Sequence, residues 1–159
     1  MFGEEKGWDY MDRLHANVAS YTHSGSKPCK MAAAGETVVG VSFEFRGASA
    51  KTDGAPIEVI TPSEGLGWDM EANGIIAGTP NLEAAQTLMD WAITPEAMAQ
   101  YNVGFGVLAL PGVAQPVPNY PAGAEPGMIK NDFEWAANNR AAILEEWSTR
   151  YDNKSEPKT

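Results

Sequence analysis

The sequence is poor in cysteine and in basic residues, and these shortages exclude several classes of protein. A single cysteine, Cys29, among 159 residues excludes an internal disulfide and offers no cysteine framework for a metal. Only 11 Lys and Arg residues stand against 21 Asp and Glu residues, which gives a formal net charge of −10. An acidic chain without a basic cluster argues against a nucleic-acid partner.

Long apolar runs are also missing. No uninterrupted apolar stretch approaches the roughly 20 residues that a membrane-spanning helix needs. The N-terminal stretch MFGEEKGWDYMDRL has no basic start followed by an apolar core, so it does not have the pattern of a signal peptide. Hydrophobic residues still make up 43% of the chain and charged residues 20%, which favours a globular core over disorder.

Helix signals are present at both ends and in the middle of the chain. Apolar residues recur every three or four positions in residues 4–19, and a short helix is expected over 27–34. Another helix is expected after a cap at Asn81, and the next one after a cap at Thr94. The last helix is expected to begin near Asn131 or Asp132.

Strand signals lie between the expected helices. β-Branched and aromatic residues predict strands at 37–45, 57–62 and about 70–77, and the glycine-containing residues 47–56 predict a loop. Alternation of strands with helices predicts an α/β fold with mostly parallel, short sheets flanked by helices. The expected sheet is short for the number of helices, so we expect the chain to be part of something larger.

The stretch Ser24-Gly25-Ser26 is a candidate anion site. It precedes the short helix expected at 27–34, whose first N–H groups have no partners within the helix and whose dipole adds positive potential. Serine hydroxyls add donors, and glycine lets a ligand approach the backbone. This arrangement suits a phosphate, a phosphonate or a carboxylate. The alternative interpretation is an ordinary serine cap.

Two further stretches carry candidate charges. Glu64, Asp69 and Glu71 lie within eight positions of one another and close to Trp68, and a carboxylate beside an aromatic face suits an ammonium group. A solvated turn is the alternative there. Glu44 shares one face of the strand expected at 37–45 with the arginine two positions later, and the alternative is a surface ion pair worth under about 1 kcal/mol.

Catalytic and metal-binding patterns are weak. His15 and His23 are eight residues apart, which is the wrong spacing for one helical face. Cys29 lies beside a helix start, but no His–Asp or His–Asn arrangement accompanies it, so a buried thiol is the expected role. We therefore expect neither a metal site nor an enzyme, although a transferase that uses the anion site is an alternative.

Three stretches together resemble one family. They are YTHSGSKPCKMAAAGETVVGVSFEFRGA, GAPIEVITPSEGLGWDMEANGII and IKNDFEWAANNRAAILEEWSTRYDNKSEPK. They resemble the periplasmic solute-binding proteins of ABC transporters assigned to 2-aminoethylphosphonate, within the larger group that contains ferric-iron-binding proteins. The resemblance covers nearly the whole chain and is more specific for the wider group than for the phosphonate branch.

This resemblance implies a type II periplasmic-binding-protein-like fold, with two lobes joined by crossing strands and the ligand in the cleft between them. Members of the family are longer, so we expect this chain to be a C-terminal half. Residues 1–60 would then form the C-terminal part of lobe two. Residues 61–159 would form the hinge crossing and the C-terminal part of lobe one.

The resemblance also implies roles for particular residues. It places the anionic end of the ligand at Ser24, Gly25 and Ser26. The stretch GETVVGVSFEFRG lacks the tyrosine pair that holds iron in the ferric branch, so iron would lose its usual ligands. The ammonium end is expected at Glu44 or Asp69, with the ring face of Trp68 beside it. Ferric iron or another small anion is the alternative ligand.

Partners and location follow from the same resemblance. It implies a periplasmic protein without a cofactor, which delivers its small-molecule ligand to the permease of an ABC transporter. We also expect the chain to form a homo-oligomer, because a half-protein leaves sheet edges and apolar helix faces uncovered.

Overall fold

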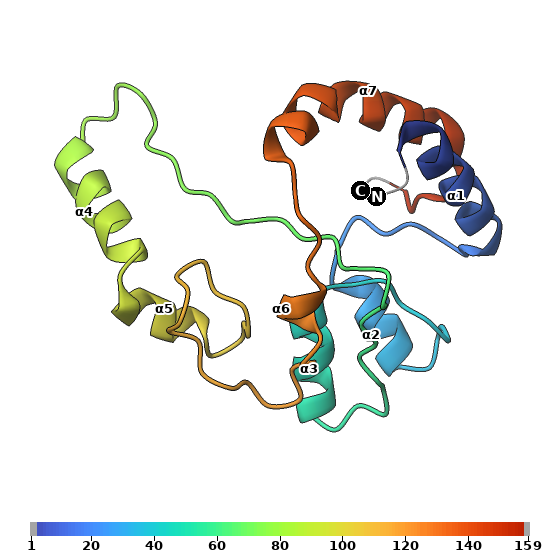
Figure 1. The fold of residues 1–159 in the computed structure, drawn as a ribbon, viewed down its shortest axis with the longest axis horizontal. Coiled ribbons are helices and arrows are strands. Elements are labelled where there is room, and N and C mark those ends of the chain that lie inside the picture. Colours follow the sequence, from blue (N-terminus) through green and yellow to red (C-terminus); the bar gives the residue numbers. More distant parts are fainter. Residues whose placement is uncertain (1–2, 158–159) are drawn as a thin grey trace. The chain divides into compact units, whose positions relative to one another are not determined.

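A computed structural model describes residues 3–157 of the chain. It divides into two compact units, each described here by itself (Figure 1). The terminal unit comprises the described residues up to 27 together with those from 132 onward. The central unit comprises residues 28–131. These units are groups of residues that contact one another within this chain, so they do not test the lobe boundary expected between residues 60 and 61, which stays a prediction.

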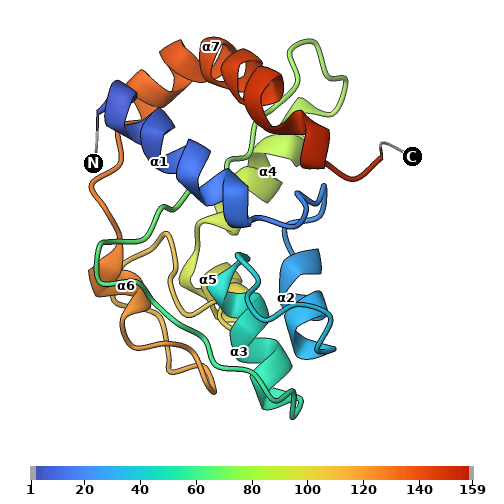
Figure 2. The same cartoon turned by 90° about the vertical axis from the view of Figure 1, so that its right-hand side faces the viewer.

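The terminal unit contains two helices from opposite ends of the chain. They are α1 (Glu4–Asn17) and α7 (Phe133–Tyr151), which lie side by side in both views (Figures 1 and 2). The short 3-10 helix η1 (Asp152–Lys154) follows α7. The Asp132 side chain accepts a hydrogen bond from Trp135 N at 2.9 Å, so the predicted cap of the last helix is confirmed.

The contact between α1 and α7 is centred on Tyr151, whose side chain is 1% exposed. Its hydroxyl donates to Asp12 Oδ1 at 2.7 Å, and Arg150 Nη1 donates to the other oxygen of Asp12 at 3.0 Å. The Tyr151 ring also lies 5.0 Å from the His15 ring and 6.3 Å from the Trp8 ring, measured between centroids. Aromatic packing and one shared carboxylate therefore hold this unit together.

The central unit contains five helices among its described residues. They are α2 (Lys27–Ala33), which begins one residue before the unit, α3 (Glu44–Thr52), α4 (Leu82–Ala92), α5 (Pro95–Tyr101) and α6 (Ala124–Gly127). The Thr94 side chain accepts from Ala97 N at 3.3 Å with Pro95 at the start of α5, as predicted. Asn81 occupies the expected cap position of α4 but makes no side-chain capping bond.

The strand predictions are not confirmed. Within residues 3–157 there is no β-strand, and the two isolated bridges there are both parallel, Tyr21 with Ser155 and Leu66 with Met128. The mostly parallel sheet of the predicted α/β class is therefore not confirmed either. A strand needs a partner as well as β-branched residues, and the stretches at 37–43, 57–62 and 70–77 have no strand partner among the described residues.

At Glu44 and Phe45 the strand prediction is wrong, because α3 begins there, directly after the extended residue Phe43. An acidic residue at a helix start is stabilised by the helix dipole, which favours Glu44 at this position. The loop prediction for residues 47–56 is wrong from Gly47 to Thr52, because α3 continues to Thr52. Gly47 lies inside α3 at close range to Val59, since a Cβ atom there would lie 2.7 Å from Val59 Cγ2.

None of the helices formed by the described residues is both long enough and apolar enough to cross a membrane.

Candidate functional site

The turn that was predicted to hold an anion lies in the terminal unit. Ser24 and Gly25 are exposed and Ser26 is half-buried. The carbonyl oxygen of Ser24 accepts from the hydroxyl of Thr22 at 2.9 Å and from Lys27 N at 3.2 Å, which closes the turn onto the first residue of α2. These two bonds fix the local backbone in a tight turn.

A carboxylate from the C-terminal tail lies directly beside this turn. His23 N donates to Glu156 Oε1 at 2.6 Å, and Lys27 Nζ forms a short ion pair with the other oxygen of Glu156. The hydrogen bond from Lys27, followed by that from His23, lowers the pKa of Glu156. The donors next to Ser24–Ser26 therefore already stabilise one negative charge from within the chain.

The tail is held in place by its backbone as well. Tyr21 N donates to the carbonyl of Lys154 at 2.9 Å, and Glu156 N donates to the carbonyl of Tyr21 at 2.9 Å. The Lys154 ammonium also donates to two carbonyl oxygens near the end of α1, those of His15 at 2.6 Å and Val18 at 2.8 Å. These bonds fix Glu156 relative to the turn.

Glu44, the first residue of α3, lies in the central unit and pairs with a residue that the sequence did not indicate. The hydroxyl of Tyr120 donates to Glu44 Oε1 at 2.5 Å. Burial, and then this hydrogen bond, raise the pKa of Tyr120 well above its ordinary value. The phenol is therefore held neutral as a donor to the carboxylate.

Gly106 provides the space that Tyr120 occupies. A Cβ atom at Gly106 would lie 2.6 Å from Cδ1 of the Tyr120 ring, closer than any real side chain tolerates. The nearby backbone of Gly106 and Val107 lowers the pKa of Tyr120 in part. Only glycine at position 106 lets the ring reach both this backbone and Glu44.

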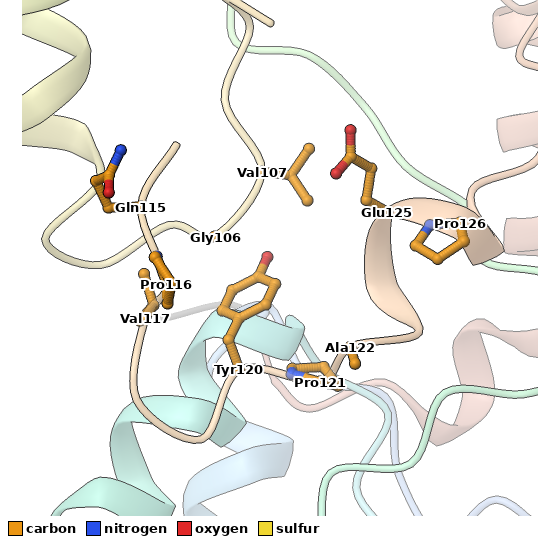
Figure 3. Close-up of a pocket in the computed structure, with 10 residues that line it drawn as sticks. All are labelled: Gly106, Val107, Gln115, Pro116, Val117, Tyr120, Pro121, Ala122, Glu125 and Pro126. Carbon is orange, nitrogen blue, oxygen red and sulfur yellow. The ribbon is translucent and has the colours of Figure 1, made fainter. Parts of the chain in front are cut away.

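The Tyr120 ring forms one wall of a pocket of about 240 Å³ in the central unit (Figure 3). Figure 3 shows the ring between the segment that carries Gly106 and Val107 and the helix α6, which carries Glu125. The lining residues are Gly106, Val107, Gln115, Pro116, Val117, Tyr120, Pro121, Ala122, Glu125 and Pro126. Glu125 is the one charged residue in this lining, and it is exposed to solvent.

Trp68 has a structural role in the central unit. Its indole Nε1 donates to the carbonyl of Ile129 at 2.7 Å, and Asn131 Nδ2 donates to the carbonyl of Trp68 at 2.8 Å. The adjacent bridge between Leu66 and Met128 joins the same two segments. Trp68 therefore ties residues 66–68 to residues 128–131, and it does not line the pocket beside Tyr120.

Asp69 is exposed, and its Oδ1 accepts from its own neighbour Met70 N at 2.8 Å. This local bond fixes the carboxylate against the backbone and leaves its exposed edge toward solvent. The two carboxylates predicted to bind an ammonium group thus have different surroundings. Glu44 accepts a hydrogen bond from a half-buried tyrosine, and Asp69 accepts one from an exposed backbone N–H.

The sequence-predicted residues fall into both units. Ser24, Gly25 and Ser26 belong to the terminal unit, whereas Glu44, Trp68 and Asp69 belong to the central unit. Sequence reasoning missed Tyr120 and Glu156, which lie 76 and 133 positions from the residues that they bond. The only sequence signal at Tyr120 is an aromatic residue inside a proline-rich stretch. No group of three or more His, Cys, Asp or Glu residues suited to a metal occurs within residues 3–157.

Comparisons with known proteins identify relatives of the chain. The family model described as bacterial extracellular solute-binding protein matches residues 3–126. An uncharacterized protein of Haemophilus influenzae is 32% identical over 92% of this chain and 44% of its own length. A gamma-aminobutyric acid-binding protein of Pseudomonas aeruginosa is 26% identical over 77% of this chain and 37% of its own length.

A probable ABC transporter periplasmic-binding protein of Sinorhizobium fredii is 29% identical over 64% of this chain and 28% of its own length. The chain thus spans less than half the length of these curated relatives. No solved structure matches the chain. Because the family model covers most of the sequence, the chain belongs to the bacterial extracellular solute-binding protein family.

Proposed function

We propose that this chain belongs to the solute-binding component of an ABC importer, which binds 2-aminoethylphosphonate or a similar small phosphonate zwitterion in a cleft between two lobes. The observation that carries the solute-binding role is the family match over residues 3–126. In this proposal the protein is periplasmic, is not an enzyme, and passes its ligand to a transporter permease. The assignment of residues 1–60 to lobe two and 61–159 to the hinge crossing and lobe one belongs to the same proposal.

The ligand class rests on two considerations. One relative is named for gamma-aminobutyric acid, which carries an amine at one end and an acid at the other. An aminophosphonate has the same arrangement of charges, with a phosphonate in place of the carboxylate. The stretch GETVVGVSFEFRG contains no tyrosine, which disfavours a ferric-iron ligand.

We assign the anionic end of the ligand to Ser24, Gly25 and Ser26. What supports this assignment is the exposure of the tight turn, whereas the neighbouring Glu156 carboxylate, which accepts from His23 N at 2.6 Å, places a negative charge beside it that opposes an anion. Replacing both serines by alanine removes two hydroxyl donors, each worth about 0.5–1.5 kcal/mol. The double variant should therefore bind the phosphonate at least about fivefold more weakly.

We assign the ammonium end to Glu44 or Asp69, with the indole face of Trp68 as a further contact. Charge-assisted hydrogen bonds and cation–π contact are the interactions expected for an ammonium group. Glu44→Gln and Asp69→Asn each remove charge while keeping shape. The variant at the true site should lose affinity for 2-aminoethylphosphonate and keep its affinity for methylphosphonate, which lacks the amine.

The test is isothermal titration calorimetry of the 159-residue chain. The ligands are 2-aminoethylphosphonate, methylphosphonate, gamma-aminobutyrate, inorganic phosphate and ferric citrate. Tightest binding of 2-aminoethylphosphonate supports the proposal, and tightest binding of gamma-aminobutyrate or ferric citrate replaces the ligand assignment. If Glu44→Gln and Asp69→Asn both weaken the two phosphonates equally, the assignment of the ammonium end fails.

Self-association of the chain is the remaining part of the proposal. Large apolar side chains are exposed in both units, including Leu88 at 62% and Trp135 at 56%. Monomeric proteins normally bury such side chains or scatter them singly, whereas clusters of them mark interaction surfaces.

A further inference from the structure

The carboxylate of Glu44 carries a charge that no cation in the described part of the chain neutralises. The sequence left open a surface ion pair between Glu44 and Arg46, but no such pair forms within residues 3–157. The Arg46 guanidinium lies instead over the Phe45 ring, 4.9 Å from its centroid. Glu44 is half-buried, so water screens its charge less than it screens an exposed carboxylate.

A single hydrogen bond holds the Glu44 side chain among the described residues, and its donor is neutral. The Tyr120 hydroxyl donates to Oε1 at 2.5 Å, whereas Oε2 receives no donor from residues 3–157. Burial, followed by this bond, raises the pKa of the phenol, so Tyr120 stays uncharged and leaves the negative charge of Glu44 in place. The carboxylate is thus fixed through one oxygen and can accept from a ligand at the other.

Tyr120 is itself held against α3, the helix that Glu44 begins. The backbone of Gly106 lies so close to the Tyr120 ring that a Cβ atom there would lie 2.6 Å from Cδ1. At the last residue of α3, Thr52 Oγ1 accepts from Asn119 Nδ2 at 3.0 Å and donates to the Pro118 carbonyl at 3.4 Å. Residues 118–120 therefore bond to both ends of α3, which fixes the phenol relative to Glu44.

Asp69, the other carboxylate considered for the ammonium end, lacks this support. It is exposed, and its Oδ1 accepts from the adjacent Met70 N at 2.8 Å. Solvent screens the attraction between an exposed carboxylate and a cation, so such a pair contributes little. Glu44 combines partial burial, an intact charge and a fixed orientation, which together favour a charge-assisted hydrogen bond from an ammonium group.

We infer that Glu44 binds the ammonium end of the ligand and that Tyr120 is the positioning residue that orients it. The phenol occupies Oε1 and leaves Oε2 for the ligand, and Tyr120 acts through Glu44 without touching the ligand. An arginine or lysine in its place would neutralise the charge that attracts the ammonium group, whereas a phenylalanine would leave the carboxylate free to turn. This inference rests on the proposed solute-binding function and selects between the two carboxylates named there.

The experiment is isothermal titration calorimetry of the 159-residue chain with two matched pairs of ligands. The pairs are 2-aminoethylphosphonate with ethylphosphonate and gamma-aminobutyrate with butyrate. The members of a pair differ only by the amine, so the ratio of their dissociation constants measures the preference for the amine. Tyr120→Phe should reduce this preference about three- to tenfold and leave the affinity for the amine-free ligand unchanged. A general loss of structure would weaken both members of a pair.

Further variants separate positioning from packing. Gly106→Ala displaces the Tyr120 ring and should also reduce the preference for the amine, whereas Gly104→Ala, with open space around it, is the matched control. Tyr101→Phe removes a hydroxyl elsewhere in the same unit and is the second control. Glu44→Gln should abolish the preference, and adding Tyr120→Phe to it should have no further effect because Tyr120 acts through Glu44. Circular dichroism checks that each variant keeps its helices.

The outcomes are distinct. A chain that binds no amine-bearing ligand overturns both the proposed function and the inference. Binding that shows no preference for the amine, or whose preference Asp69→Asn removes and Glu44→Gln keeps, overturns the inference and leaves the solute-binding role standing. The same holds if Tyr120→Phe changes the preference no more than Tyr101→Phe does. A preference that falls in Tyr120→Phe and Gly106→Ala, but not in the two controls, supports the inference.

Discussion

The bond between Tyr120 and Glu44 offers the sharpest test of the central unit. Tyr120→Phe removes one oxygen and leaves the ring beside Gly106 in place. In the folded protein that oxygen donates to Glu44 Oε1 at 2.5 Å across 76 positions of sequence. The variant therefore removes a long-range tie between the start of α3 and the segment that precedes α6.

The expected loss follows from the charge of the acceptor and from its exposure. A hydrogen bond to a charged group contributes about 1.5–3 kcal/mol when it is shielded from water. Glu44 is only half-buried, so solvent competes for its oxygens and the loss should be about 1–2 kcal/mol. A change of this size lowers the melting temperature of a chain of this length by about 2–8 °C.

The assay is urea unfolding followed by circular dichroism at pH 7. Tyr101→Phe is the matched control, because Tyr101 lies in the same unit, is 40% exposed and has no contact with Glu44 among the bonds described. A double-mutant cycle with Glu44→Ala isolates the pair from the other effects of each substitution. The coupling free energy should be about 1–2 kcal/mol.

Two results would refute this reasoning. The first is a Tyr120→Phe variant as stable as the wild type, or no less stable than Tyr101→Phe. The second is additive behaviour in the cycle, which would mean that Tyr120 and Glu44 contribute to stability independently.

Three other predictions concern packing and pH. Burial raises the pKa of Tyr151 to about 12. The contribution of the neutral phenol to the free energy of unfolding is therefore complete below the unfolded pKa of about 10 and is lost as the pH rises toward 12. The urea midpoint measured from pH 8 to 12 should decline, and it should decline less in Tyr151→Phe. Gly106→Ala should destabilise the chain by about 1–3 kcal/mol in urea unfolding because its Cβ meets a ring, whereas Gly104→Ala, with open space around it, should have no such cost. Trp68→Phe should cost about 1–3 kcal/mol by leaving the Ile129 carbonyl without its donor, and unchanged thermal unfolding would contradict that role.

Helix starts were the most predictable part of the fold. Thr94 followed by proline and Asp132 at the start of α7 both cap helices as predicted, because a capping side chain and the backbone N–H that donates to it lie within three residues of each other. Such signals are complete within a short window of sequence. The position of Asn81 was also correct, although its side chain does not make the capping bond.

Strands were less predictable because they depend on distant partners. The β-branched residues at 37–43 favour an extended backbone, but a ladder forms only when another strand pairs with it. Glu44 and Phe45 satisfied the strand pattern as well, yet they begin a helix. Two residues are too few to distinguish the alternation of a strand from the first turn of a helix, and an acidic residue such as Glu44 is compatible with both.

The tie between Glu44 and Tyr120 was not predictable for a different reason. Neither residue belongs to a motif, and only the folded chain brings them together. The same holds for Glu156 and the turn at Ser24–Ser26, where sequence reasoning found the anion-binding pattern but not the internal carboxylate beside it. Interactions over such separations carry no local signal.

The pairing of α1 with α7 has a consequence for biosynthesis. Asn17 ends α1 and Phe133 begins α7, so 116 positions of sequence separate a helix from the one that covers it. At about 5–20 residues per second, a ribosome needs about 6–23 s to make that interval. During this time α1 is outside the ribosome without its packing partner, while the residues of the central unit are already available to fold. The order of synthesis therefore favours completion of the central unit before Tyr151 can reach Asp12, and the terminal unit is the last part of the chain to become protected from proteases and chaperones.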